Sequence, residues 1–179
     1  YLRSLTLTLE KMATKKTLIT KDKIVSMYMN YRLEHNEQPK SVYQFSKING
    51  FDESQFYSFF GTLESVEKEI FKMFLEKTVA LIQKDPAYEG YDMKNKMLSF
   101  YFTFFELLSA NRSYVVMSLK EHQNLLKNLT QLSGLRMEFK NYITQIISDE
   151  VRTQHEKFQN FQEKAIQETS WIQFLLTMK

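Results

Sequence analysis

The amino-acid sequence predicts an all-α protein, for three reasons. Only four Gly and two Pro occur in 179 residues, too few for a fold with many tight turns. Apolar residues recur three or four positions apart along most of the chain, which is the spacing of one helix face. The breaks between these segments are short, as in a helix bundle. The longest nearly unbroken apolar run, residues 100–108, is about half of the roughly 20 residues in a membrane span.

The composition also argues against several kinds of site. The chain has no Cys, which excludes disulfides, thiolate zinc sites and Cys nucleophiles and fits a reducing cytoplasm. Its three His lack metal-binding spacing, and neither a Gly-rich phosphate loop nor a Gly-x-Ser-x-Gly motif occurs. We therefore expect a soluble cytoplasmic protein that is not an enzyme and needs no metal or cofactor.

Charge is unevenly distributed along the chain. Residues 1–50 carry nine Lys and Arg against four Asp and Glu, whereas residues 51–179 carry fifteen against seventeen. A basic N-terminal part predicts an anionic partner there, either nucleic acid or an anionic membrane surface. The plain alternative is a solvated Lys-rich segment.

The first third of the chain predicts three helices. Residues 1–19 are expected to be a flexible arm or a remnant foreign to the native protein. Thr20 can cap the first helix, which the polar stretch 34–40 ends. Ser41 can cap a short second helix that Asn49-Gly50 terminates, and Asp52 can cap a third. Together these helices would form a head at residues 20–62.

The remaining residues, 63–179, are expected to form a second, larger helical domain. It would begin with a connecting helix at 63–84, and residues 85–92 form the clearest internal break because they hold Pro86 and Gly90. Further helices are predicted at 92–109, 112–127, 131–149 and 153–178.

The junction between head and connecting helix resembles the TetR family of bacterial regulators. In that family the third helix ends in Tyr-x-x-Phe and leads into a helix of the type Lys-Glu-x-Leu. Tyr57, Phe60, Glu64 and Val66 match these positions, within a resemblance of roughly 50 residues. Positions that match the family's core pattern are Ile24, Tyr28, Val42, Phe45, Ile48, Phe51 and Phe56. The resemblance implies a three-helix DNA-binding head and a helical-bundle domain for ligand binding and dimerisation.

Two departures weaken the expected grip on DNA. The Lys that opens the fourth helix in the family is Leu63 here, and Asp52 and Glu53 open the reading helix. Carboxylates repel phosphates, and each lost phosphate contact lowers sequence-independent affinity, so we interpret Asp52 as an N-cap. Most of the electrostatic attraction to DNA would then come from the lysines of the N-terminal arm. Expected DNA contacts are Lys15, Lys16, Lys21, Lys40, Ser41, Tyr43, Lys47, Ser54, Gln55 and Tyr57.

The segment at 93–108 is the most aromatic of the chain. It is apolar nearly all round between Met97 and Leu108, which predicts a central helix with neighbours on several sides. Its aromatic and Met side chains fit a filled core and a hydrophobic ligand pocket about equally well. The candidate pocket residues are Met97, Phe100, Tyr101, Phe104, Phe105, Tyr114, Met117, Tyr142 and Trp171.

The last predicted helix becomes more apolar toward its end, with Ile166, Trp171 and Phe174 on one side. The resemblance implies a homodimer through the C-terminal helices, and one further helix of the family is expected to be missing after Lys179. We favour a dimeric regulator that binds operator DNA and responds to a small hydrophobic ligand. Two alternatives stay open: a lipid- or isoprenoid-binding accessory protein that no longer reads DNA, like the ubiquinone-biosynthesis relatives of this fold, and a protein-interaction scaffold.

Overall fold

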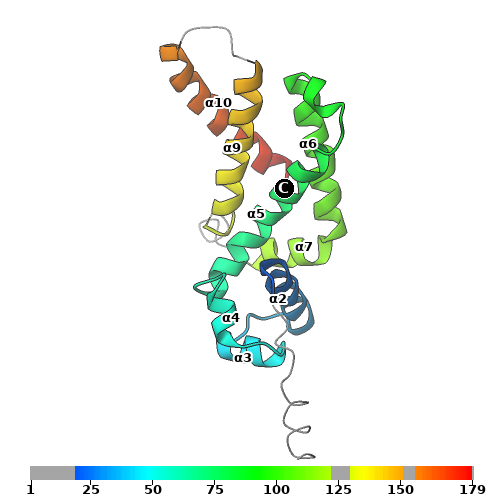
Figure 1. The fold of residues 1–179 in the computed structure, drawn as a ribbon, viewed down its shortest axis with the longest axis vertical. Coiled ribbons are helices and arrows are strands. Elements are labelled where there is room, and N and C mark those ends of the chain that lie inside the picture. The colour runs from blue at the N-terminus through cyan, green and yellow to red at the C-terminus, as the bar shows by residue number, and fades with distance from the viewer. Residues whose placement is uncertain (1–18, 122–129, 151–155, 179) are drawn as a thin grey trace, which may run out of the picture.

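The computed structural model describes residues 19–121, 130–150 and 156–178, which contain eight α-helices and no strand. A head of three helices lies at one end of an elongated molecule, and a bundle forms the rest (Figure 1). The head contains α2 (Lys21–His35), α3 (Val42–Ile48) and α4 (Glu53–Tyr57). The all-α prediction is confirmed.

The head helices begin where the sequence places their caps. The hydroxyl oxygens of Thr20 and Ser41 accept hydrogen bonds from the backbone N–H groups of Lys23 and Gln44, at 3.2 and 3.1 Å. Each bond satisfies a donor that a helix N-terminus otherwise leaves unpaired. Gly50 adopts φ 72°, a left-handed conformation that Gly accepts without strain, and so reverses the chain after α3.

The centre of the head is aromatic. The Phe45 ring is fully buried and meets the rings of Tyr28, Tyr31 and Phe56 edge-on, with centroids 5.9, 6.4 and 6.1 Å away. The prediction that Ile48 belongs to this core is wrong, because 56% of its surface is exposed. At about 100° per residue, the three positions from Phe45 place Ile48 about 60° to the side of the inward face, at the last residue of α3.

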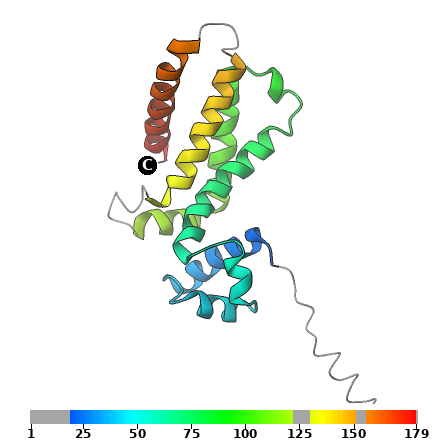
Figure 2. The same ribbon diagram turned by 60° about the vertical axis from the view of Figure 1, so that its left-hand side comes forward.

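A long helix, α5 (Leu63–Ile82), leaves the head and runs into the bundle (Figure 2). A 3-10 turn, η1 (Tyr88–Gly90), then leads to the other bundle helices. These are α6 (Met93–Ala110), α7 (Arg112–Glu121), α9 (Ser133–Glu150) and α10 (Glu156–Thr177). The predicted helices agree within a few residues, and the predicted continuation of 112–127 beyond residue 121 lies outside the described residues. α7 packs on α2, so the bundle touches the head through a second element besides α5.

Aromatic rings hold α6, α9 and α10 together. Phe100, Phe104, Phe139 and Phe174 are fully buried, and the rings of Phe139 and Phe174 stack with centroids 4.6 Å apart. The Phe100 and Phe104 rings also stack, at 5.5 Å. Burying a ring of this size contributes about 1.5–3 kcal/mol through the removal of apolar surface from water.

α6 has neighbours on several sides, as predicted, but its outer face is open. On that face, 50% of Leu98 and 71% of Phe102 are exposed. The covered side carries Phe100, Phe104 and Leu108, and α6 packs against α5, α7 and α9. An apolar composition all round therefore did not bring burial all round.

Gly134 allows α9 to approach α5 closely. A Cβ atom at this position would meet the Lys68 carbonyl oxygen at 3.1 Å and the Lys72 Cβ at 3.3 Å. Both distances are shorter than a comfortable carbon contact, so a side chain here would push the helices apart. The α5–α9 contact is thus fixed close to where α5 leaves the head.

Candidate functional site

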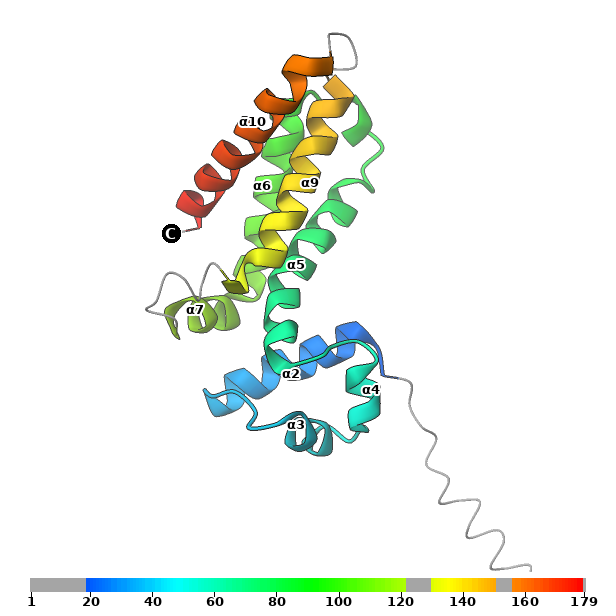
Figure 3. The ribbon, with the colours of Figure 1, turned by 90° about the vertical axis from the view of Figure 1, so that its left-hand side faces the viewer.

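The two short helices α3 and α4 form the end of the head that points away from the bundle (Figure 3). Residues 49–52 join them. Of the ten residues predicted to contact DNA, six are exposed on or beside these helices: Lys40, Ser41, Tyr43, Lys47, Ser54 and Tyr57. Gln55 is partly buried, and Lys15 and Lys16 lie outside the described residues.

Two of these polar side chains already serve the backbone. The Ser41 oxygen caps α3. The Gln55 Oε1 atom accepts a hydrogen bond from the backbone N–H of Asp52, at 3.1 Å, which fixes the start of α4. Gln55 can therefore offer a partner the donors of its Nε2 amide group. Asp52 is the N-cap residue of α4, as we interpreted it from the sequence.

The predicted lysines differ in their surroundings. The Lys21 ammonium donates a hydrogen bond to the Glu69 carboxylate, so an acidic partner within the protein neutralises its charge. Lys47 is exposed, and its ammonium lies 5.7 Å from the centroid of the Tyr43 ring. Cation and ring together form a site where a phosphate or a base can bind.

Leu63, which occupies the position of the family's Lys, is part of the core and does not lie on the outer surface of the head. Only 9% of Leu63 is exposed, because the first turn of α5 packs into the core rather than along the outer edge of the head. Thr62 caps this turn by accepting a hydrogen bond from the backbone N–H of Ser65 at 3.2 Å. Burial of Leu63 stabilises the junction between head and bundle.

A buried polar network crosses the same junction. The Glu67 Oε1 atom accepts hydrogen bonds from the Tyr28 hydroxyl at 2.8 Å and the Gln38 amide at 2.9 Å. The Arg32 guanidinium lies 3.5 Å from this oxygen, and both charged side chains are more than nine-tenths buried. Burial and then the Glu67 charge raise the pKa of the Tyr28 phenol. Nothing in the local sequence predicts the network, because Tyr28 and Glu67 are 39 positions apart.

The residues predicted to line a hydrophobic pocket lie mostly in packed regions. Phe100, Phe104 and Trp171 are almost completely buried in the aromatic cluster of α6, α9 and α10, and Tyr114 of α7 is almost completely buried elsewhere in the core. Met97, Tyr101, Phe105 and Met117 are partly buried against the same core. Cavities formed by described residues lie elsewhere around the bundle, and Tyr142 is the one predicted pocket residue that lines any of the three considered, all of them within the described part of the chain.

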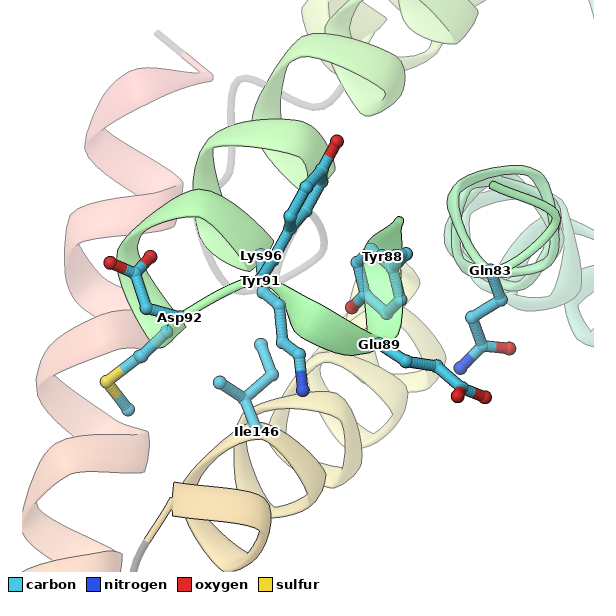
Figure 4. Close-up of a pocket in the computed structure, with 8 residues that line it drawn as sticks. Gln83, Tyr88, Glu89, Tyr91, Asp92, Lys96 and Ile146 are labelled. Atoms are coloured by element: carbon cyan, nitrogen blue, oxygen red, sulfur yellow. The ribbon is translucent and has the colours of Figure 1, made fainter. Parts of the chain in front are cut away.

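One of these cavities has a polar lining and a volume of about 660 Å³. It lies where the end of α5, the η1 turn and the start of α6 face α9 (Figure 4). Such a volume is in the range of small-molecule sites. We name it the distal cavity; it is lined by Gln83, Tyr88, Glu89, Tyr91, Asp92, Met93, Lys96 and Ile146. From the sequence, residues 85–92 were expected only to form a break between helices, so this site was not predicted.

Two tyrosines and a lysine are linked at the wall of the distal cavity. The Tyr88 and Tyr142 hydroxyl oxygens are 2.8 Å apart, and the Tyr142 hydroxyl donates to the Lys96 carbonyl oxygen at 3.3 Å. Burial and the bond to Tyr88 raise the pKa of the Tyr142 phenol, which therefore stays protonated. Only 7% of Lys96 is exposed, and its ammonium lies 5.7 Å from the centroid of the Tyr88 ring.

Within the described residues, no group of three His, Asp or Glu side chains is placed to hold a metal ion. In the same part of the chain, no helix combines the length and the apolar character that a membrane crossing requires.

Comparison with known families supports one identification. Residues 96–179, from α6 to the end of the chain, match the family described as tetracyclin repressor-like, C-terminal domain. No curated protein and no solved structure matches the chain significantly. This match begins after the segment on which the resemblance rests, because the Tyr57-to-Val66 pattern lies before residue 96. From both halves we conclude that this chain belongs to the TetR family.

Proposed function

We propose that this protein is a transcriptional regulator that binds operator DNA as a homodimer and changes its DNA affinity when a small ligand binds the bundle. α3 and α4 of each subunit would contact one half-site, with α4 as the reading helix. The C-terminal helices α9 and α10 would pair with those of a second copy, where Met137, Ile172 and Leu176 present exposed apolar side chains.

The observation that carries this proposal is the shared exposure of six predicted contact residues on α3, α4 and the turn before α3. They combine two cations with hydroxyl groups, the side chains that contact DNA phosphates and bases. Lys40 and Lys47 are the cationic contacts in this arrangement, because Lys21 is paired with Glu69.

The test is DNA binding by fluorescence anisotropy across a salt series, with DNA from upstream of the gene against scrambled DNA of equal length. We expect specific binding with nanomolar affinity, roughly 10³-fold or more above the scrambled control. Lys47→Ala should weaken binding to both DNAs and lower the salt slope by about 1. Lys94→Ala removes an exposed lysine of α6 and is the matched control, for which we expect no change. Equal affinity for both DNAs would refute operator recognition.

One observation favours the lipid-binding alternative. The outer side of the head is unusually apolar for a DNA contact surface, with Tyr43, Ile48, Tyr57 and Phe59 all more than 40% exposed. Aromatic and aliphatic side chains next to lysines also suit an anionic membrane surface.

Co-flotation with vesicles separates the two readings. Vesicles of phosphatidylcholine with and without phosphatidylglycerol should leave a DNA-binding regulator in the soluble fraction. If the protein floats with the anionic vesicles and shows no preference for the upstream DNA over the scrambled DNA, and if Ile48→Ser with Phe59→Ser abolishes flotation, the accessory function is supported instead.

A further inference from the structure

We propose that the distal cavity binds a small zwitterion, a molecule that carries one carboxylate and one ammonium group on an apolar body, such as an amino acid with an apolar side chain. Binding itself does not depend on DNA. The additional inference that this ligand is the effector rests on the proposed function.

The carboxylate partner would be the Lys96 ammonium. Lys96 is more than nine-tenths buried, yet its side chain lines the cavity, where Figure 4 shows its nitrogen directed toward Ile146 and α9. Few lysines are buried to this extent, and a charged donor in a poorly solvated site forms stronger hydrogen bonds than one at the surface. An ammonium also has three donors, so it can bind a carboxylate while keeping other contacts.

The ammonium partner follows from the direction of the tyrosine hydrogen bonds. The Tyr142 hydroxyl donates to the Lys96 carbonyl oxygen at 3.3 Å, and in this arrangement the 2.8 Å bond between the two hydroxyls uses the Tyr88 proton. The Tyr88 oxygen is then left with acceptor capacity only. Glu89 and Gln83, which line the cavity on the side of α5, add a carboxylate and an amide oxygen (Figure 4). This part of the cavity therefore favours a ligand that donates hydrogen bonds.

The charges around the cavity argue against a simple anion. The lining contains one cation, Lys96, and two carboxylates, Glu89 and Asp92. Asp92 caps α6 by accepting a hydrogen bond from the backbone N–H of Asn95 at 2.8 Å, and it points away from the Lys96 nitrogen in Figure 4. An anion near Lys96 would still be repelled by Glu89, whereas a zwitterion places an opposite charge beside each.

The remaining walls set the character of the ligand's body. Met93 and Ile146 line the cavity together with the rings of Tyr88 and Tyr91. These apolar and aromatic groups, set beside a mainly polar lining, suit a ligand that has a small apolar body as well as charged groups. Gln83 is the C-cap residue of α5, so a ligand here would touch the helix whose other end supports the head.

Isothermal titration calorimetry without DNA tests the binding. The probes are L-phenylalanine and L-leucine, N-acetyl-L-phenylalanine, which lacks the ammonium, and phenethylamine, which lacks the carboxylate. We expect at least one of the two amino acids to bind with a Kd below about 1 mM. Each truncated analogue should bind at least about tenfold more weakly than L-phenylalanine. The proposal is overturned if neither amino acid binds, or if either analogue binds as well as the zwitterion.

Two substitutions test the assignment of each charge. Lys96→Met keeps an unbranched side chain and should remove the preference for L-phenylalanine over phenethylamine. Glu89→Gln should remove the preference over N-acetyl-L-phenylalanine. Lys94→Met and Glu106→Gln change exposed residues of α6 and are the matched controls, with both preferences retained. Preferences that survive in both site variants would overturn the assignment, and circular dichroism checks that each variant is folded.

The anisotropy assay then separates this inference from the proposed function. Binding of the amino acid with no operator binding by the protein would refute the regulator and leave the site intact. Operator binding that does not respond to a bound amino acid would refute its role as effector.

Discussion

Replacing Glu67 by Ala should destabilise the protein more than any other single change to a carboxylate in the described part of the chain. Glu67 joins α5 to the head through Tyr28, Gln38 and Arg32. Its removal leaves the Arg32 charge buried without its carboxylate, a change that typically costs about 3–5 kcal/mol. For a protein of this size, each kcal/mol lowers the melting temperature by about 2–4 °C, so we expect a drop of roughly 10 °C.

Thermal and urea unfolding followed by circular dichroism measure this effect. Glu69→Ala is the control, because Glu69 pairs with a partly exposed lysine, Lys21, and such pairs contribute at most about 1 kcal/mol. A double variant, Arg32→Met with Glu67→Leu, should recover most of the lost stability, because apolar side chains of similar volume replace buried ion pairs well. A Glu67→Ala protein as stable as Glu69→Ala would refute this account of the junction.

Three further changes probe the bundle. Gly134→Val should cost about 1–3 kcal/mol of unfolding free energy by forcing α9 away from the Lys68 carbonyl; Gly61→Val, where the added atoms meet open space, is the control, and equal losses would contradict the close-approach argument. Phe139→Ala should cost about 3–5 kcal/mol, measured by urea unfolding, because the ring is fully buried against Phe174 and Trp171. Hydrogen bonds from Lys140 and then Arg136 hold the pKa of the Glu168 carboxyl below its ordinary value of 4.5. The stability that the Glu168 carboxylate contributes is therefore fully present at pH values above 4.5 and is lost as the pH falls through the lowered pKa. The difference in melting temperature between wild type and Glu168→Gln should shrink from pH 7 to pH 3, and a difference that grows would contradict the pairing.

Local signals carried most of the fold. Thr20, Ser41 and Asp52 were predicted as caps and lie at helix starts, because capping depends on a few neighbouring backbone groups. Apolar spacing also placed the long helices within a few residues. It failed for Ile48 and for the outer face of α6, since spacing identifies an apolar face but cannot say whether another element covers it.

The sites were less accessible from the sequence for the same reason. An aromatic stretch indicates both a core and a pocket, and only tertiary packing shows Phe100 and Phe104 stacked against neighbouring rings. The distal cavity forms between the η1 turn and α9, which are more than 50 residues apart at the Tyr88–Tyr142 hydrogen bond. No local sequence pattern around Tyr88 predicts its contact with Tyr142. The DNA-contact residues remain predictions, which binding measurements will test.

The continuity of α5 has a mechanical consequence. The helix has 20 residues, which is about 30 Å at a rise of 1.5 Å per residue. A rod of this length that tilts by about 4° at its bundle end carries its head end through about 2 Å. Its first turn packs in the head and its last residues border the distal cavity, so a small tilt at the cavity end becomes a larger displacement at the head end. On the proposed function, a ligand in the distal cavity would shift the head through this helix.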